Sequence, residues 1–145
     1  MLKFTSTLRQ PGRIVHAHCD LPCGVYDPAQ ARIEAESVAK IQEKYQDAAN
    51  QKKPSESEDD FKARCLVIKE ERADMVKHHL WVLWTDYFKP PHFAKYPQLH
   101  ELFNKATKQA GAAGGKGSVD PAEGQALLDS IAEIDKIFWE TKQAS

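Results

Sequence analysis

The dipeptide Asp-Pro occurs twice in this chain, at residues 27–28 and 120–121, and each copy precedes a long stretch with the composition of a helix. Aspartate at the N-cap followed by proline is a typical helix start, because the carboxylate accepts an otherwise unpaired backbone N–H and proline has none to pair. After the second copy, apolar residues recur at spacings of four, three and four, at Leu127, Ile131, Ile134 and Phe138. This spacing predicts a helix with one apolar face that packs against other helices.

Helical patterns of this kind predict four helices, near residues 28–49, 59–88, 92–111 and 121–142. A polar connection separates the first two at 50–60. The pair Pro90-Pro91 should end the second helix, since neither residue donates a backbone hydrogen bond, and a glycine-rich stretch at 111–117 is typical of a flexible linker. No segment shows the strict alternation of a strand. The predicted fold class is all-α, an antiparallel four-helix bundle.

The residues expected on the buried faces are mostly apolar and recur at helical spacings. They are Ile33, Val38, Ile41 and Tyr45 in the first helix, Phe61, Cys65, Ile68, Met75, His79 and Val82 in the second, and Leu99, Leu102, Phe103 and Ala106 in the third. Of the pair His78-His79, one residue should face the core and the other should be exposed. Trp81, Trp84 and Trp139 are expected in packing or in subunit interfaces.

Composition excludes several classes of protein. With 145 residues the chain forms one domain, and 20 basic against 21 acidic side chains give a net charge of −1, so the basic surface of a nucleic-acid-binding protein is absent. No apolar run approaches the roughly 20 residues that a membrane-spanning helix needs. Residues 1–17 contain three basic side chains and no acidic one, and they make a poor secretory signal. A removable pro-segment, a weak transit peptide and a frayed terminus all fit them.

The chemistry is concentrated in residues 18–24, His-Cys-Asp-Leu-Pro-Cys-Gly. Proline and glycine make a helix improbable there, so a tight hook that carries two thiols is expected, and such a hook suits a disulfide or a soft metal ion. If the chain were cut between Ala17 and His18, a free amine, the Cys19 amide and two thiolates could surround one ion. That donor set favours square-planar Ni(II) or Cu(II), with the His18 imidazole as a fifth, axial ligand.

Residues 18–26, HCDLPCGVY, resemble the nickel hook of the nickel superoxide dismutase family. The resemblance continues through residues 27–37 and resumes at 67–70, 78–79, 83–93 and 134–141. It covers most of the chain after residue 17. The polar connection near 46–60 departs from the family pattern and is longer.

The resemblance implies an enzyme that disproportionates superoxide into dioxygen and hydrogen peroxide through Ni(II)/Ni(III) cycling, with one nickel ion per subunit. It also implies a homohexamer, and a protease that removes residues 1–17 and leaves the domain 18–145, with the hook at 18–26. A nickel chaperone is expected as a further partner, whereas nucleic acid and a membrane are not expected as partners. Thiolate ligands need a reducing or metal-protected environment, which favours the cytoplasm.

Carried over by position, the resemblance implies a role for individual residues. The nickel ligands are His18, Cys19 and Cys23. Glu34 and Arg72 orient the axial imidazole, and Tyr26 and Tyr87 limit access to the open face of the metal. Smaller roles fall to Asp20 and Asp86 in hydrogen bonding near the pocket, to Pro22 in turning the hook, and to Lys89 in attracting an anion.

Two other classes of function remain open from the residues. A non-enzymatic helical-bundle module that binds or delivers metal would share the fold and the two hook cysteines, but it would need neither a cleaved terminus nor the supporting residues. A thiol–disulfide protein would use the same cysteines, but the chain lacks the βαβ pattern of thioredoxins. Taken singly, Glu34 and Arg72 also fit a solvated helix face, Tyr87 a half-buried core edge, and Cys65 a small core residue.

Overall fold

The computed structural model describes residues 24–112 and 114–143. The expected pro-segment and the hook residues His18, Cys19, Asp20, Pro22 and Cys23 lie outside these ranges. The regular structure in the described ranges is helical, without a strand, which confirms the predicted all-α class.

Seven helical elements make up the described chain. They are α1 (Ala29–Gln46), α2 (Ala48–Gln51), α3 (Glu58–Val82), the short π-helical turn η1 (Leu83–Tyr87), α4 (Pro90–Lys95), α5 (Leu99–Ala110) and α6 (Pro121–Gln143). None of these helices is long and apolar enough to cross a membrane.

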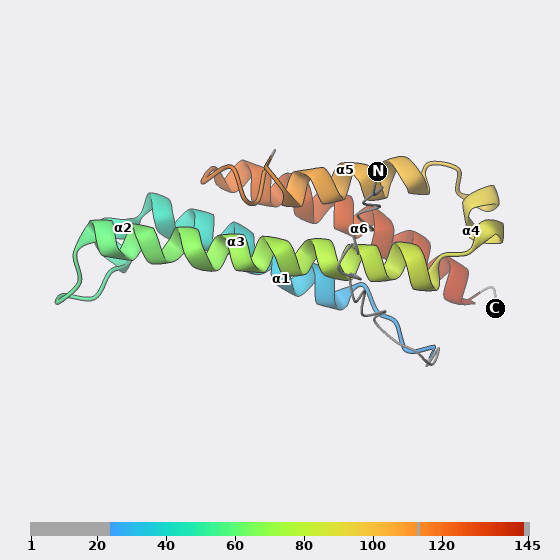
Figure 1. Ribbon diagram of the computed structural model, residues 1–145, viewed down its shortest axis with the longest axis horizontal. Coiled ribbons are helices and arrows are strands. Elements are labelled where there is room, and N and C mark those ends of the chain that lie inside the picture. Colours follow the sequence, from blue (N-terminus) through green and yellow to red (C-terminus); the bar gives the residue numbers. More distant parts are fainter. Residues whose placement is uncertain (1–23, 113, 144–145) are drawn as a thin grey trace, which may run out of the picture.

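The four long helices run along the longest axis of the molecule, with α2 at one end and α4 at the other (Figure 1). The helix α1 packs against α3 and α6, and α5 packs against the same two helices. Helices that follow one another in the chain are therefore neighbours and run in opposite directions, so the predicted antiparallel four-helix bundle is confirmed. Tyr26, Tyr87 and the end of α6 come together toward the α4 end of the bundle.

Both Asp-Pro pairs start helices as predicted. The Asp27 carboxylate accepts the N–H of Ala29 at 2.8 Å, and the Asp120 carboxylate accepts the N–H of Ala122 at 2.9 Å. Each bond pairs one of the free donors of a first helical turn.

Two predicted helix boundaries are wrong. The first helix does not run unbroken to residue 49, because Asp47 leaves helical geometry (φ −103°, ψ 28°) and separates α1 from α2. The third predicted helix is in fact α4 and α5. Tyr96 precedes Pro97, a position that disfavours helical backbone, and its ψ of 74° ends α4. Pro90 and Pro91 begin α4 rather than merely ending the helix before it, since the first turn of a helix needs no donor there.

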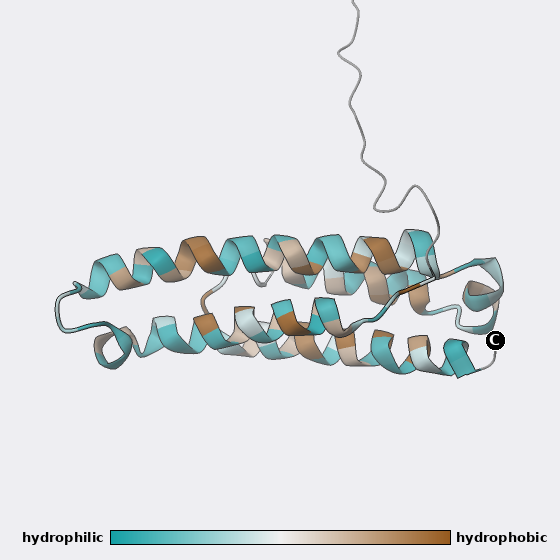
Figure 2. Cartoon of the chain, turned by 90° about the horizontal axis from the view of Figure 1, so that it is seen from below, coloured by the Kyte–Doolittle hydropathy of each residue, from teal (hydrophilic) through white to brown (hydrophobic). Residues whose placement is uncertain are grey.

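The predicted core is confirmed for the second half of the chain. The four apolar residues expected in α5 and the four in α6 are all buried. Hydrophobic and hydrophilic residues alternate along the long helices (Figure 2), as expected for helices that each bury one side.

For α1 and α3 the predicted faces are partly wrong, although Val38 and Cys65 are buried as predicted. In α1, Ile33 is 51% exposed, whereas the residues that are buried are Ala31, Glu34, Ala35, Val38 and Gln42. In α3 the exposed residues include Ile68 and Met75, and the buried ones are Cys65, Lys69, Ala73, Val76 and Leu80. Small alanine side chains let these two helices approach closely, which leaves several larger aliphatic residues outside.

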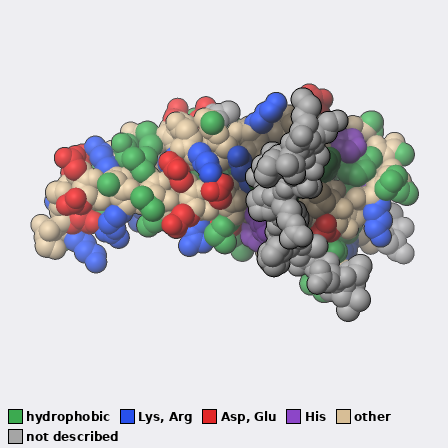
Figure 3. Space-filling view, viewed as in Figure 1, with side chains coloured by type: hydrophobic (Ala, Val, Ile, Leu, Met, Phe, Trp, Pro, Cys, Tyr) green, Lys and Arg blue, Asp and Glu red, His purple; other side chains and the backbone are tan. Residues whose placement is uncertain are grey.

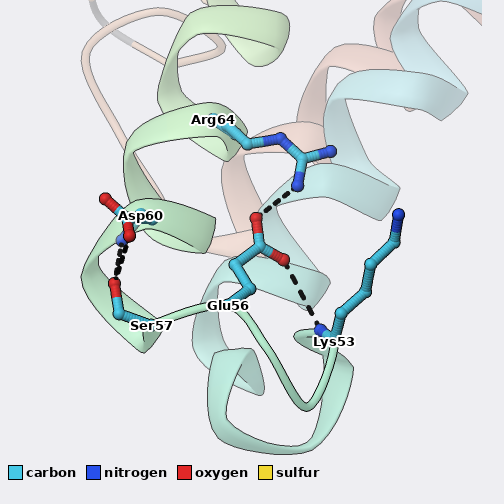
Figure 4. A network of polar contacts seen from close by, with 5 residues as sticks. All are labelled: Lys53, Glu56, Ser57, Asp60 and Arg64. Atoms are coloured by element: carbon cyan, nitrogen blue, oxygen red, sulfur yellow. Dashed lines mark hydrogen bonds and ion pairs between the residues drawn. The ribbon is translucent and has the colours of Figure 1, made fainter.

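The polar connection between α2 and α3 is held by its own side chains (Figure 4). Glu56 pairs with Arg64 and accepts the backbone N–H of Lys53 at 3.5 Å. Ser57 caps α3 by accepting the N–H of Asp60 at 3.1 Å. This connection lies at the end of the bundle away from α4, as Figure 1 shows.

Two residues of the glycine-rich stretch, Gly115 and Lys116, are hydrogen-bonded to α3. Lys69 of α3 is 1% exposed, and its Nζ donates to the carbonyls of Gly115 at 2.7 Å and Lys116 at 2.5 Å. The Lys116 ammonium in turn lies 2.6 Å from the Asp74 carboxylate. Burial lowers the pKa of Lys69, and the two carbonyls compensate in part for the lost hydration of its charge.

Candidate metal centre and its surroundings

An ion pair joins α1 to α3. One nitrogen of the Arg72 guanidinium, Nη1, lies 3.0 Å from Oε2 and 3.3 Å from Oε1 of Glu34. The Glu34 side chain is 11% exposed and that of Arg72 is 42% exposed, so the carboxylate is the buried member. The Sδ atom of Met75 accepts from the same nitrogen at 3.9 Å. The pair holds the carboxylate in one orientation inside the bundle.

Two tyrosines meet where the chain enters α1. Tyr26 precedes α1 and Tyr87 ends η1, and their ring centroids are 5.8 Å apart at an interplanar angle of 55°. Both residues are half-buried against the core. The Tyr87 ring also lies 4.3 Å from that of Phe138 and stacks on His92 at 5.6 Å. The two phenols, which are 61 positions apart in the sequence, therefore share one site.

The backbone two residues before Tyr26 has a conformation that favours glycine. Gly24 has φ +73°, in the left-handed region that favours glycine. This geometry is incompatible with a helix through residue 24, in agreement with the non-helical hook expected at its N-terminal side.

Comparison with known proteins identifies the family. The family described as nickel-containing superoxide dismutase matches residues 13–142. The superoxide dismutase [Ni] of Streptomyces coelicolor is 61% identical over 139 residues, 96% of this chain and 98% of the relative. The corresponding protein of Streptomyces seoulensis is 63% identical over 141 residues, with the same coverage. The chain belongs to the nickel-containing superoxide dismutase family.

The fold agrees with this assignment. A crystal structure of a nickel-containing superoxide dismutase with nickel ligation corresponding to the oxidised state is 63% identical and superimposes with a TM-score of 0.76, over 87% of this chain and 99% of the other. The predicted activity is confirmed: this dismutase uses nickel to disproportionate superoxide into dioxygen and hydrogen peroxide. The comparisons give no support to a metal-delivery module without activity.

Other expected site residues of the dismutase lie at its surface. Asp86 is exposed and accepts a hydrogen bond from the Thr85 hydroxyl at 2.8 Å. Lys89 is exposed, and its backbone N–H donates to Nδ1 of His92 at 3.2 Å. Burial and the Lys89 charge lower the pKa of His92, whose ring stacks on that of Tyr87.

Within the part of the chain that the structure describes, Cys65 and the imidazoles form no second metal centre. Cys65 is buried, as predicted, and burial raises the pKa of its thiol. His78 is exposed and His79 is half-buried. Among residues 24–112 and 114–143, no three histidine, cysteine or acidic side chains come close enough to hold a metal ion. Acidic and basic side chains are interspersed over the α2 and α3 end of the face in Figure 3.

Sequence reasoning missed two neighbours of Tyr87. His92 stacks on its ring, and Thr141 of α6 lies 2.7 Å from its hydroxyl oxygen. Both residues fall within the segments of family resemblance, but only their positions in the bundle connect them to Tyr87.

Proposed function

We propose that the nickel ion of this dismutase is held by His18, Cys19 and Cys23. His18 supplies its amine and its imidazole, and Cys19 its amide nitrogen and its sulfur. These donors fit the metal, because thiolate and amidate ligands are strongly electron-releasing and favour a square-planar ion. Nickel bound there supplies a one-electron couple that oxidises one superoxide and reduces the next.

Printed descriptions of solved relatives support this assignment. Three of them are variants with replacements at a first-position histidine, a third-position aspartate and a ninth-position tyrosine. His18, Asp20 and Tyr26 of this chain have the same residue types at the same spacing, with His18 in the first position.

Glu34 orients the His18 imidazole in this proposal. The Glu34–Arg72 pair is the observation that carries it. Its carboxylate is only 11% exposed and is fixed by a guanidinium, which is not expected of a residue on a solvated helix face. A carboxylate that accepts the free N–H of a metal-bound imidazole fixes the ring and raises its basicity. Arg72 acts through Glu34 by holding its two oxygens.

Tyr26 and Tyr87 restrict access to the open face of the site. Cys23 precedes Tyr26 by three residues, so the Cα atoms of these two residues lie within about 11 Å of each other. Two aromatic rings in contact narrow an entrance to the size of a small anion and exclude larger reductants. In this proposal Lys89 attracts that anion, and Asp86 takes part in hydrogen bonds at the rim.

We also propose that residues 1–17 are a pro-segment removed before the metal binds. The solved relatives are covered almost completely by 87% of this chain, about 126 residues, close to the 128 that follow residue 17. The precursor should be inactive, because the His18 nitrogen is an amide while it is joined to Ala17, and its lone pair is delocalised into the carbonyl. Processing requires a protease, and metal loading a nickel chaperone, in the cytoplasm.

Assembly into a homohexamer completes the proposal. Large apolar side chains are exposed on several helices of the single chain, among them Ile33, Val67, Trp81 and Trp139 at 43–60%. Such residues are suited to contacts between subunits. Size measurement of the processed protein tests this step.

The hook is tested by replacing its cysteines. We expect Cys19→Ser and Cys23→Ser each to abolish nickel binding and dismutase activity while the helical circular-dichroism spectrum persists, since the four helices do not include the hook. Cys65→Ser is the matched control, and it should retain nickel while losing about 1 kcal/mol of stability, because its thiol is buried. Full nickel content in either hook variant contradicts the ligand set.

The pro-segment is tested by blocking cleavage. Substitution of Ala17 by a residue that the protease rejects should yield a precursor that neither binds nickel nor dismutes superoxide. N-terminal sequencing of the active protein should begin at His18. A precursor as active as the processed form contradicts this part of the proposal.

A further inference from the structure

Thr141, near the end of α6, contacts the hydroxyl of Tyr87 from within the bundle. The threonine is 4% exposed, and its Oγ1 lies 2.7 Å from the Tyr87 hydroxyl oxygen. The same Oγ1 donates to the backbone carbonyl of Phe138 at 2.7 Å. Tyr87 is thus linked by its hydroxyl to a helix 54 positions later in the sequence.

Counting hydrogens gives this contact a direction. A threonine hydroxyl has one hydrogen, and that of Thr141 engages the Phe138 carbonyl. With that hydrogen on the carbonyl, the Tyr87 phenol donates to Thr141 Oγ1; in the reverse arrangement, in which Thr141 donates to the phenol, the phenol donates to the Phe138 carbonyl instead. Among the described residues, a second acceptor near this phenol is the Phe138 carbonyl at 3.4 Å, which also belongs to α6. The single phenolic hydrogen of Tyr87 therefore points at α6 rather than at the ring of Tyr26.

The ring of Tyr87 is fixed by its neighbours as well. Phe138 lies 4.3 Å away at 40°, and His92 stacks at 5.6 Å with an interplanar angle of 23°. These contacts restrict the plane of the ring, and the bond to Thr141 restricts how far it can swing toward Tyr26. An aromatic side chain that is packed on its face and hydrogen-bonded at its hydroxyl is restricted in position.

We propose that Thr141 is a positioning residue of the superoxide reaction. It holds Tyr87 as a fixed steric gate beside Tyr26 and directs the phenolic hydrogen into the bundle. Tyr87 therefore restricts which anions reach the site and does not give its proton to the reacting superoxide. This inference rests on the proposed access role of Tyr87.

Three single variants and one double variant of the processed, nickel-loaded enzyme test it. Thr141→Val removes the acceptor without changing the shape of the side chain, and Tyr87→Phe removes the donor. Each should change KM for superoxide and the inhibition constant of azide, a small-anion probe, by about threefold or more, with kcat and its pH profile retained. The Tyr87→Phe/Thr141→Val double variant should match the single variants, because both remove the same bond. Thr141→Ser keeps the hydroxyl and should behave as the wild type.

The outcomes distinguish failure of the inference about Thr141 from failure of the proposed access role of Tyr87. Additive effects in the double variant, or equal effects of Thr141→Val and Thr141→Ser, would show that Thr141 does not act through Tyr87. A large loss of kcat in Tyr87→Phe that Thr141→Val does not share would make Tyr87 a proton donor and overturn the inference. Tyr87→Ala removes the whole ring, and if it leaves KM and azide inhibition unchanged, the access role itself is wrong. Nickel content and thermal melting confirm that each variant is loaded and folded.

Discussion

Of two substitutions in the Glu34–Arg72 pair, we expect Arg72→Met to lose more stability and Glu34→Gln to lose more activity. Arg72→Met leaves the Glu34 carboxylate, 11% exposed, without its cation. Breaking a fully buried pair costs about 3–5 kcal/mol, but Arg72 is 42% exposed and water can replace it in part, so we expect roughly 1–2 kcal/mol. Glu34→Gln keeps an oxygen that accepts from Arg72 and removes the buried charge, so its cost should be about 0.5 kcal/mol.

For activity we expect the larger loss in Glu34→Gln. If Glu34 accepts the imidazole N–H of His18, the neutral amide of Glu34→Gln loses the charge that raises the basicity of that ring. Removal of such a partner costs about 10–100-fold in activity or metal affinity. Arg72→Met leaves the carboxylate in place but less well oriented, so its loss should be smaller, within about tenfold.

Thermal melting measures the loss of stability in each variant, and superoxide consumption per bound nickel measures the loss of activity. One kcal/mol corresponds to roughly 3–5 °C in a chain of this length. The exposed pair Arg32–Glu36 on the same helix is a matched control, with side chains 48% and 51% exposed and a 2.6 Å separation. Arg32→Met and Glu36→Gln should change stability by less than about 0.5 kcal/mol and activity by less than about twofold. If the same variant were worse in both assays, or if Glu36→Gln lost as much activity as Glu34→Gln, the reasoning would be refuted.

Three further predictions concern the bundle. Gly124→Ala should lower stability by about 1–2 kcal/mol in chemical denaturation. Alanine favours helices, but here its Cβ would lie 2.7 Å from the Cα of Ala39. A gain in stability would show that α1 and α6 separate freely. Because the pKa of His92 is lowered from 6.5, its contribution to stability is complete above pH 6.5 and declines as the pH falls toward the folded-state pKa. The melting temperature should therefore fall less steeply below pH 6.5 in His92→Gln than in the wild type, and parallel profiles would contradict this. Lys69→Met should cost about 1–3 kcal/mol, because it leaves the Gly115 and Lys116 carbonyls without this donor. Hydrogen exchange at residues 111–117 should accelerate. Unchanged exchange would mean that this loop does not depend on the lysine.

Sequence alone determined the features that depend on neighbours along the chain. The helix starts at Asp27 and Asp120 could be predicted because a side chain caps the turn that directly follows it. The buried faces of α5 and α6 followed from spacing, since each of these helices has one dominant apolar stripe. The hook could be recognised because its donor atoms lie within six consecutive residues, 18–23, where residue types and spacing suffice.

Tertiary structure decided what depends on residues far apart in sequence. In α1 and α3 apolar residues occur on more than one side, and the close approach of alanines selected the face that is buried. Lys69 is buried because a distant loop supplies two carbonyls to its charge. Glu34 meets Arg72 across 38 positions and Tyr87 meets Thr141 across 54. Such pairs depend on the register of one helix against another, which the packing of the whole bundle sets and no local pattern encodes.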